Sequence, residues 1–146
     1  MYSRIYTDGA CRGNPGDSAW AYVRFDSFDA FSRVMQDSGY IGVATNNEAE
    51  YWGIIHALRS LAEHDPRKNV ALYSDSQVAI RQITGESVCT CRTHLRLREL
   101  IADLVQQIGH ERVRFCHVRR TEPGVQIADR LCNQTLDRVL TGTPWQ

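Results

Sequence analysis

The feature that most constrains this chain is a change in the spacing of its apolar residues near Asn46. Before that point, residues 3–7, 19–25 and 31–43 read as strands, and the short gap at residues 26–30 suits a hairpin. The first three strands are therefore expected to form an antiparallel meander. After Asn46 the apolar residues recur every three or four positions, as in an amphipathic helix. They are Tyr51, Ile54, Ile55, Leu58, Leu61 and Ala62.

The rest of the chain alternates helices with strands. The first helix is expected to be capped near Thr45 or Asn46, and glycines at 85 and 109 are expected to close the next two. The other expected elements are strands over residues 70–73 and 113–118 and helices over residues 76–83, 97–108 and about 125–140. Strands joined through helices pair in parallel with right-handed crossovers. The sequence therefore predicts a single α/β domain over residues 1–146, with helices flanking a five-stranded mixed sheet of three antiparallel strands followed by two parallel ones.

Composition excludes several other classes of protein. No run of about 18 apolar residues could cross a bilayer, so no membrane contact and a cytoplasmic location are expected. Five cysteines are an odd number with irregular spacing, which favours reduced thiols over a disulfide framework or a paired zinc site. Cys89 and Cys91 leave open a redox-active or metal-binding pair, against the alternative of an ordinary loop. A monomer is expected because no apolar stripe is left over once the core helices are assigned.

The charge of the chain says little about a partner. Its 17 basic and 17 acidic side chains give a net charge of zero. Seven of the ten basic residues after residue 75 form two clusters, Arg92, Arg96 and Arg98, and Arg112, Arg114, Arg119 and Arg120. A solvated helix face explains the first cluster as readily as contacts with phosphates would.

Four carboxylates are positioned to meet at one edge of the expected sheet. Asp8 follows the first strand and Asp75 the fourth, so both are expected at the carboxyl edge where α/β sheets bind ligands. Glu50 and Asp129 are expected in or near the first turns of the helices that follow the third and fifth strands. Each acid taken alone is explained as well by a solvated turn or a helix cap.

Acids that cluster in this way either take up protons or recruit cations. Oxygen ligands without histidine or cysteine favour Mg²⁺ or Mn²⁺, and four negative charges would neutralise two such ions. Two ions about 3.5 to 4 Å apart can activate water and stabilise the leaving oxygen of a phosphodiester. The four carboxylates therefore predict a metal site that hydrolyses nucleic acid.

The residues around these acids resemble the motifs of type 1 ribonuclease H. Residues 5–16 read Ile-Tyr-Thr-Asp-Gly-Ala-Cys-Arg-Gly-Asn-Pro-Gly, which is similar to the opening motif of the family. Residues 45–51, 73–77 and 128–133 resemble its other three acidic motifs, in the same order and spacing. The resemblance covers nearly the whole chain.

This resemblance implies an endonuclease that cuts the RNA strand of an RNA/DNA hybrid and leaves 5′-phosphate and 3′-hydroxyl ends. It implies two ions of Mg²⁺ or Mn²⁺, with Asp8 shared by both. Glu50 and Asp75 would complete the shell of one ion, and Asp129 would hold the other. Glu50 would also lie near the ribose 2′-hydroxyl, the group that distinguishes RNA from DNA.

Further positions match residues that contact the hybrid in this family. They are Asn14, Asn47 and Gln77, and for each the alternative is a turn or helix-cap role. The loop at residues 119–126 lacks the histidine that many members carry before the last aspartate.

Two arginines begin that loop, and one histidine lies just before it. Arg119 and Arg120 resemble the arginines of other branches of the family, and the hypothesis is that one of them steadies the scissile phosphate or the product. For His117, a packed or surface position is favoured over a catalytic role. Residues 85–95 are too few for the basic protrusion with which some relatives grip the DNA strand.

Two alternative functions stay open at this stage. The first is a nuclease of the same fold that acts on another substrate, such as duplex RNA or a branched junction. The second is a module that binds the hybrid without cutting it. Intact acids at all four positions argue against the binding module, because burying them without a metal would only destabilise the domain.

Overall fold

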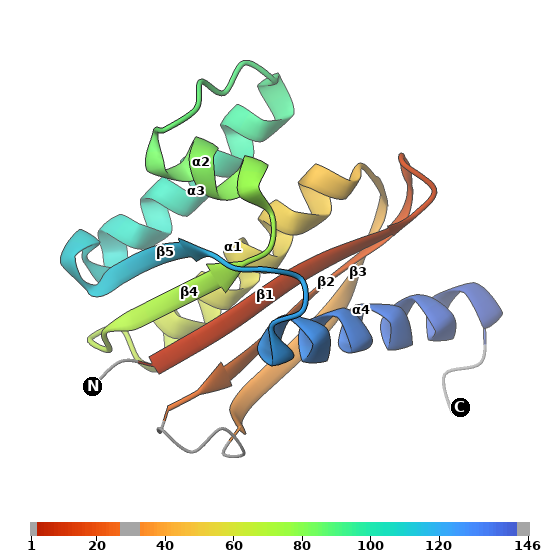
Figure 1. The fold of residues 1–146 in the computed structure, drawn as a ribbon, viewed down its shortest axis with the longest axis horizontal. Helices are drawn as coiled ribbons and strands as arrows, with labels where there is room; N and C mark the ends of the chain where they lie inside the picture. The colour runs from red at the N-terminus through yellow and green to blue at the C-terminus, as the bar shows by residue number, and fades with distance from the viewer. Residues whose placement is uncertain (1–2, 27–32, 143–146) are drawn as a thin grey trace.

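The computed structural model describes residues 3–26 and 33–142, in which a five-stranded sheet carries helices on both faces (Figure 1). Its strands are β1 (Ser3–Arg12), β2 (Gly16–Phe25), β3 (Arg33–Ala44), β4 (Val70–Ser74) and β5 (Val113–His117). They lie in the order β3-β2-β1-β4-β5. The pairs β1–β2 and β2–β3 are antiparallel, whereas β1–β4 and β4–β5 are parallel. The predicted fold class is therefore confirmed.

The helices divide between the two faces of the sheet. They are α1 (Asn46–His64), α2 (Gln77–Thr84), α3 (Arg92–Ile108) and α4 (Pro123–Thr141), with a single 3₁₀ turn, η1 (His110–Arg112), before β5. In Figure 1, α4 lies in front of β1 to β3, and α1 lies behind the sheet, where it contacts mainly β1 and β2. The largest core cluster joins the sheet to α1 and α3, and two smaller clusters lie beneath α4. Among the described residues, no helix is both long and apolar enough to span a bilayer.

Capping side chains explain where two of the helices begin. Thr45 caps α1, and its side chain accepts a hydrogen bond from the backbone N–H of Glu48 at 3.2 Å. Ser76 caps α2 in the same way, accepting from the N–H of Ala79 at 3.2 Å. The last helix begins earlier than the apolar pattern indicates, because Pro123 occupies its first turn, where a missing N–H costs no hydrogen bond.

The first strand is longer than expected. The glycine-rich segment at residues 9–16 reads as a loop, but β1 continues to Arg12, which pairs with Asp17 of β2. Only the tip of this hairpin is a turn, and Gly13 adopts a φ of +84° there. Residues 27–30 of the hairpin turn expected at residues 26–30, and the expected strand start at Phe31, lie outside the described residues.

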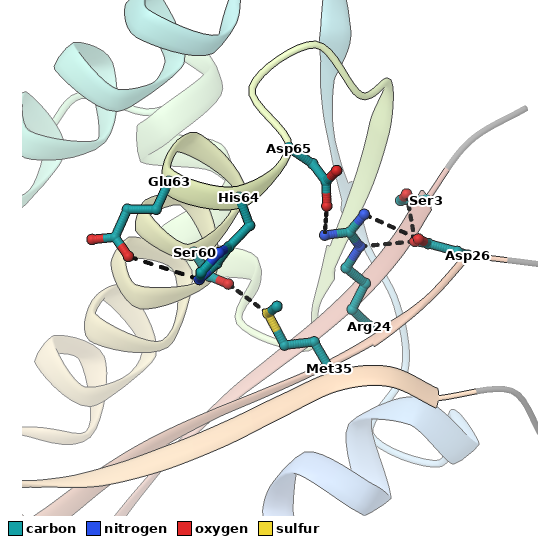
Figure 2. A network of polar contacts seen from close by, with 8 residues as sticks. All are labelled: Ser3, Arg24, Asp26, Met35, Ser60, Glu63, His64 and Asp65. Carbon is teal, nitrogen blue, oxygen red and sulfur yellow. Dashed lines mark hydrogen bonds and ion pairs between the residues drawn. The ribbon is translucent and has the colours of Figure 1, made fainter.

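A buried arginine anchors the end of the sheet where β1 begins (Figure 2). Arg24 of β2 is 2% exposed and donates to the two carboxylate oxygens of Asp26 at 2.8 and 3.0 Å. Its third nitrogen lies 2.8 Å from the carboxylate of Asp65, just after α1. Ser3 of β1 also donates to Asp26, at 2.6 Å. One guanidinium therefore ties β2 to the end of α1.

Candidate active site

Asp8 and Asp75 come together because β1 is longer than its parallel neighbour β4. The pairing of the two strands ends at Thr7 and Ser74, so the next residue of each chain segment is an aspartate. Asp8 still belongs to β1, whereas Asp75 is the first residue after β4. The expected meeting of the two acids at the carboxyl edge is thus found, although Asp8 lies within its strand rather than after it.

Glu50 joins them from α1. It is the fifth residue of that helix, so it lies in the second turn rather than the first. Its Oε1 accepts a hydrogen bond from the backbone N–H of Gly9 at 2.6 Å. This contact depends on two glycines: a Cβ at Gly9 would lie 2.3 Å from the carbonyl carbon of Ala49, and one at Gly53 would lie 2.6 Å from the carbonyl oxygen of Asp8. Sequence reasoning missed the role of both glycines, although each stands within three residues of a site acid.

The three acids form a compact group. One carboxylate oxygen from each of Asp8, Glu50 and Asp75 lies within 4.8 Å of the other two. In the part of the chain that the structure describes, no other three or more His, Cys, Asp or Glu side chains meet in this way. Asp129 lies outside the group, in the second turn of α4, and its side chain is exposed. Besides burial and the charge of Asp75, the charge of Asp129 nevertheless contributes to the raised pKa of Asp8.

Two of the acids are buried at strong electrostatic cost. Asp8 is 5% exposed, and burial, followed by the charges of Asp75 and Asp129, raises its pKa to about 8. Burial, followed by the charges of Asp8 and Asp75, raises the pKa of Glu50 well above its usual range. Oδ1 of Asp75 is also buried and has no hydrogen-bond partner among the described residues. Uncompensated oxygens of this kind fit a divalent cation, and a donor set of carboxylates alone suits Mg²⁺ or Mn²⁺.

One arginine reaches the group from the loop before α4. Nε of Arg120 lies 3.5 Å from Oδ2 of Asp75, and the arginine side chain is 89% exposed. The contact is long for an ion pair and its arginine is exposed, although the Asp75 side chain is only 9% exposed, so Arg120 can be displaced by a ligand at modest cost. Arg119 is exposed in the same loop. His117 is an exposed residue at the end of β5, in agreement with the surface position favoured for it.

The three residues expected to contact substrate have different surroundings. Oδ1 of Asn14, at the hairpin tip, accepts a hydrogen bond from the backbone N–H of Asn46 at 3.0 Å. Asn14 therefore has a structural role at the start of α1. Asn47 is half-buried in the first turn of α1. Gln77 is exposed in the first turn of α2, two residues after Asp75.

Other sequence expectations concern residues outside the acidic group. The five cysteines are free, as expected for reduced thiols. Residues 85–91 form the connection between α2 and α3, with no helix or strand of their own. Sequence reasoning also missed the contacts of Arg12, which reaches across to Asn133 and Asp137 of α4. No local pattern marks a contact between residues so far apart in the chain.

The sequence is similar to that of ribonucleases H from several organisms. The RNase H family model matches residues 2–137. Ribonuclease HI of Halobacterium salinarum is 36% identical over 138 residues, which cover 90% of this chain and 63% of that protein. Ribonuclease H of Acidovorax sp. strain JS42 is 35% identical over 150 residues, which cover 93% of this chain and 95% of that protein. The chain spans about half the length of some relatives: 80 residues matched at 39% identity cover 48% of ribonuclease H of Thermosynechococcus vestitus and 55% of this chain.

Solved structures agree with this similarity. RNase H1 from the halophilic archaeon Halobacterium salinarum NRC-1 superposes with a TM-score of 0.84 at 34% identity, covering 94% of this chain and 98% of that one. LC11-RNase H1, solved in complex with an RNA/DNA hybrid, gives a TM-score of 0.84 at 31% identity. The match covers 94% of this chain and 99% of that one. The chain therefore belongs to the ribonuclease H family, type 1, a family of hydrolases that act as endonucleases.

Proposed function

We propose that this protein cuts the RNA strand of RNA/DNA hybrids with two divalent ions and leaves 5′-phosphate and 3′-hydroxyl ends. The observation that carries the proposal is the group of three carboxylate oxygens from Asp8, Glu50 and Asp75 within 4.8 Å of one another. Family membership supports the reaction, and the complex of LC11-RNase H1 with an RNA/DNA hybrid supports the substrate. We further propose that the chain acts as a monomeric single domain in the cytoplasm.

The residues would divide the two ions between them. Asp8 would touch both, since it belongs to the group of three and also senses the charge of Asp129. Glu50 and Asp75 would complete the shell of one ion, and Asp129 would hold the other. Bound Mg²⁺ or Mn²⁺ supplies activation of water and stabilisation of the leaving oxygen. The hydrogen bond from the backbone N–H of Gly9 would hold the Glu50 carboxylate in its orientation beside Asp8.

Contacts with the hybrid would come from the ends of the elements around these acids. Oδ1 of Asn14 is occupied by the N–H of Asn46, so Asn14 would present its amide N–H₂ group to an acceptor on the hybrid. Asn47 and Gln77 would contact the hybrid from the first turns of α1 and α2. Recognition of the ribose 2′-hydroxyl near Glu50 would distinguish RNA from DNA.

Arginines would replace the missing loop histidine. The ion pair of Arg120 with Asp75 supports a position for Arg120 beside the acids. Because that pair is weak, the guanidinium is available to a phosphate of the substrate or the product. Arg119, in the same loop, is the other candidate for this role.

Cleavage assays on several substrates test this function. The purified protein is incubated with labelled RNA/DNA hybrid, duplex RNA, duplex DNA, a branched junction and single strands, in Mg²⁺, Mn²⁺ or EDTA. Metal-dependent cutting of the RNA strand of the hybrid alone is expected. Preferred cutting of duplex RNA or of the junction would assign another substrate, and binding of the hybrid without cutting would indicate a binding module.

A matched pair of variants tests the metal assignment. Asp8→Asn keeps the shape of the side chain and removes a ligand charge, so cleavage is expected to be lost. Asp103→Asn is the control, because Asp103 is an exposed residue of α3 outside the acidic group. Wild-type activity in Asp8→Asn would show that the metal assignment is wrong.

A further inference from the structure

Two rows of polar side chains meet where α4 packs on β1. Asp8 and Arg12 project from the same side of β1, because side chains alternate along a strand. Asp129, Asn133 and Asp137 form one line along α4, because residues four apart share a face of a helix. At one end of these rows, the Asp129 carboxylate lies near enough for its charge to raise the pKa of Asp8, after the larger effects of burial and Asp75.

At the other end, a single guanidinium nitrogen joins the rows. Nη2 of Arg12 lies 2.7 Å from Oδ1 of Asp137, 3.3 Å from the carbonyl oxygen of Asn133 and 3.4 Å from its Oδ1. Asn133 also contacts Asp129, one turn earlier in α4: its Nδ2 donates a hydrogen bond to the backbone carbonyl oxygen of Asp129 at 3.0 Å. Arg12 is therefore linked to the metal-ligand candidate on α4 through one intervening side chain.

The two rows have matching lengths. From Asp8 to Arg12 the strand rises about 13 Å, at roughly 3.3 Å per residue. From Asp129 to Asp137 the helix rises about 12 Å, at 1.5 Å per residue. A contact at the Asp8 end fits this register, because Sγ of Cys132, three residues after Asp129, lies 3.7 Å from the carbonyl oxygen of Asp8. When Arg12 holds Asp137, Asp129 is therefore brought beside Asp8.

The Arg12 anchor adds to a hydrogen bond at 2.7 Å between the hydroxyls of Ser38 and Thr135, which also fixes this part of α4 on the sheet. The buried contacts there are made mainly by small side chains, which interlock little along the helix axis. They are Ala19, Ala21, Ala128 and Cys132, together with Leu136. When Asp8 is ionised and no cation lies between them, the charges of Asp8 and Asp129 also repel each other. An attraction at the far end of the rows offsets this repulsion.

We propose that Arg12 is a positioning residue for Asp129, acting through Asn133 and Asp137 to set the register of α4 on β1. The inference rests on the proposed two-ion function, and it concerns the ion that Asp129 would hold. Arg12 does not touch the reacting atoms. Its role is to keep the fourth carboxylate at the edge of the group formed by the other three.

The test measures metal binding in the absence of nucleic acid. Mn²⁺ is titrated into the free protein by calorimetry, and the Mn²⁺ concentration for half-maximal cleavage and the KM for hybrid are measured in parallel. Arg12→Gln and Asp137→Asn are each expected to weaken Mn²⁺ binding at the site that Asp129 would hold by about tenfold, the lower end of the effect of losing a group that orients a ligand. The double variant should be no worse than either single one, because both remove one interaction. Arg12→Lys should lose less, since it keeps the charge.

Two comparisons separate positioning from other roles. Arg138→Gln is the matched control, because that arginine lies on the same helix and hydrogen bonds only to Thr135 within it among the contacts described. It should leave Mn²⁺ binding unchanged. If Arg12 instead contacts a phosphate, Arg12→Gln will raise KM alone and Asp137→Asn will change nothing, and that result overturns the inference. Unchanged Mn²⁺ binding in both variants overturns it as well.

Failure of the proposed function would look different. A wild-type protein that neither binds Mn²⁺ at Asp8 nor cuts hybrid would contradict the two-ion proposal itself. A wild-type protein that does both, with Arg12 and Asp137 variants that behave like it, would contradict only the positioning role. The melting temperature in EDTA should change little in all of these variants, because the Arg12–Asp137 pair is largely exposed.

Discussion

The backbone N–H of Gly9 donates to Oε1 of Glu50 at 2.6 Å, so the strand that carries Asp8 also orients the acid on α1. The helix can come this close only because Gly9 has no Cβ, which would lie 2.3 Å from the carbonyl carbon of Ala49. Relief of that clash requires one backbone segment to move. The geometry of the acidic group is thus tied to a residue that carries no side chain.

Gly9→Ala is therefore expected to impair both stability and cleavage. Pushing α1 away from β1 should cost about 2 to 4 kcal/mol of unfolding free energy and lower kcat at least tenfold, because Glu50 leaves its position. Urea unfolding and single-turnover cleavage measure the two effects. Gly85→Ala is the control: it strains a left-handed residue at the end of α2, with a φ of +85°, and should cost about 1 kcal/mol without changing kcat. An unchanged kcat in Gly9→Ala would contradict this account.

The stability of the metal-free protein is expected to fall as the pH rises. The pKa of Asp8 is about 8 in the folded protein and about 3.9 in an unfolded chain, so between these values the folded state binds more protons. Its contribution to stability is therefore fully present below pH 4 and is lost as the pH rises towards 8. The raised pKa of Glu50 acts in the same direction.

Melting temperatures in EDTA between pH 5 and 8 check this expectation. Asp8→Asn should flatten the dependence and stabilise the metal-free protein at pH 8, because no charge is then buried at that position. Mn²⁺ should stabilise the wild type more at pH 8 than at pH 5, since protons and metal compete for the same oxygens. A melting temperature that rises from pH 5 to 8 in EDTA would show that the burial of these acids is compensated in some other way.

The order of elements and the approximate place of the acids could be predicted because both follow from local patterns. Apolar spacing distinguishes the strands from the helices, and Asp75 follows directly from the end of a strand. The extension of β1 to Arg12 could not be predicted in this way. A run of glycines reads as a loop, whereas Gly9 is present because α1 approaches it, which is a tertiary contact.

The surroundings of Asp129 were the hardest part of the site to predict. The apolar pattern starts α4 at residue 125, but Pro123 begins the helix earlier and moves Asp129 into the second turn. The contact between Arg12 and Asp137 joins residues 125 positions apart in the chain, and Asp137 lies outside all four acidic motifs. Such pairings depend on how a helix is registered on a sheet, which local spacing does not determine.

Asp75→Asn and Asp129→Asn are expected to have different effects on metal binding. Asp75 belongs to the group of three oxygens within 4.8 Å, so its loss should weaken the tighter Mn²⁺ site about 10- to 100-fold. Asp129 lies outside that group. Asp129→Asn should therefore keep the tighter site, formed by the group of three, and weaken only the site that Asp129 would hold. Calorimetry with Mn²⁺ on the free protein distinguishes the two cases. Equal loss of the tighter site in both variants would show that all four acids share one ion.

Arg120→Ala is expected to lower the turnover number without destabilising the protein. Its ion pair with Asp75 is long and its side chain is 89% exposed, so the unfolding free energy should change by no more than about 0.5 kcal/mol. Cleavage kinetics under excess substrate measure turnover, and Arg119→Ala tests the neighbouring arginine in the same assay. If both variants keep the wild-type turnover number, neither arginine replaces the missing histidine.

Arg24→Met is expected to destabilise the fold without altering the acidic group. Arg24 is buried and bridges Asp26 and Asp65, and Asp26 would keep only its hydrogen bond from Ser3 among the contacts described. The two carboxylates are 25% and 44% exposed, so water can partly replace the arginine, and a cost of about 1 to 3 kcal/mol is expected.

Urea unfolding of a series of variants tests this origin of the effect. Asp65→Asn should cost less than Asp26→Asn, because Asp65 is the more exposed partner and accepts one contact from the guanidinium instead of two. The control, Arg138→Met, makes the same substitution at an exposed arginine and should be nearly neutral. The kcat of folded Arg24→Met should equal that of the wild type, since the network lies where β1 begins and Asp8 lies five residues further along that strand. A reduced kcat would mean that loss of the contact at the end of α1 displaces the whole helix and moves Glu50 at its other end.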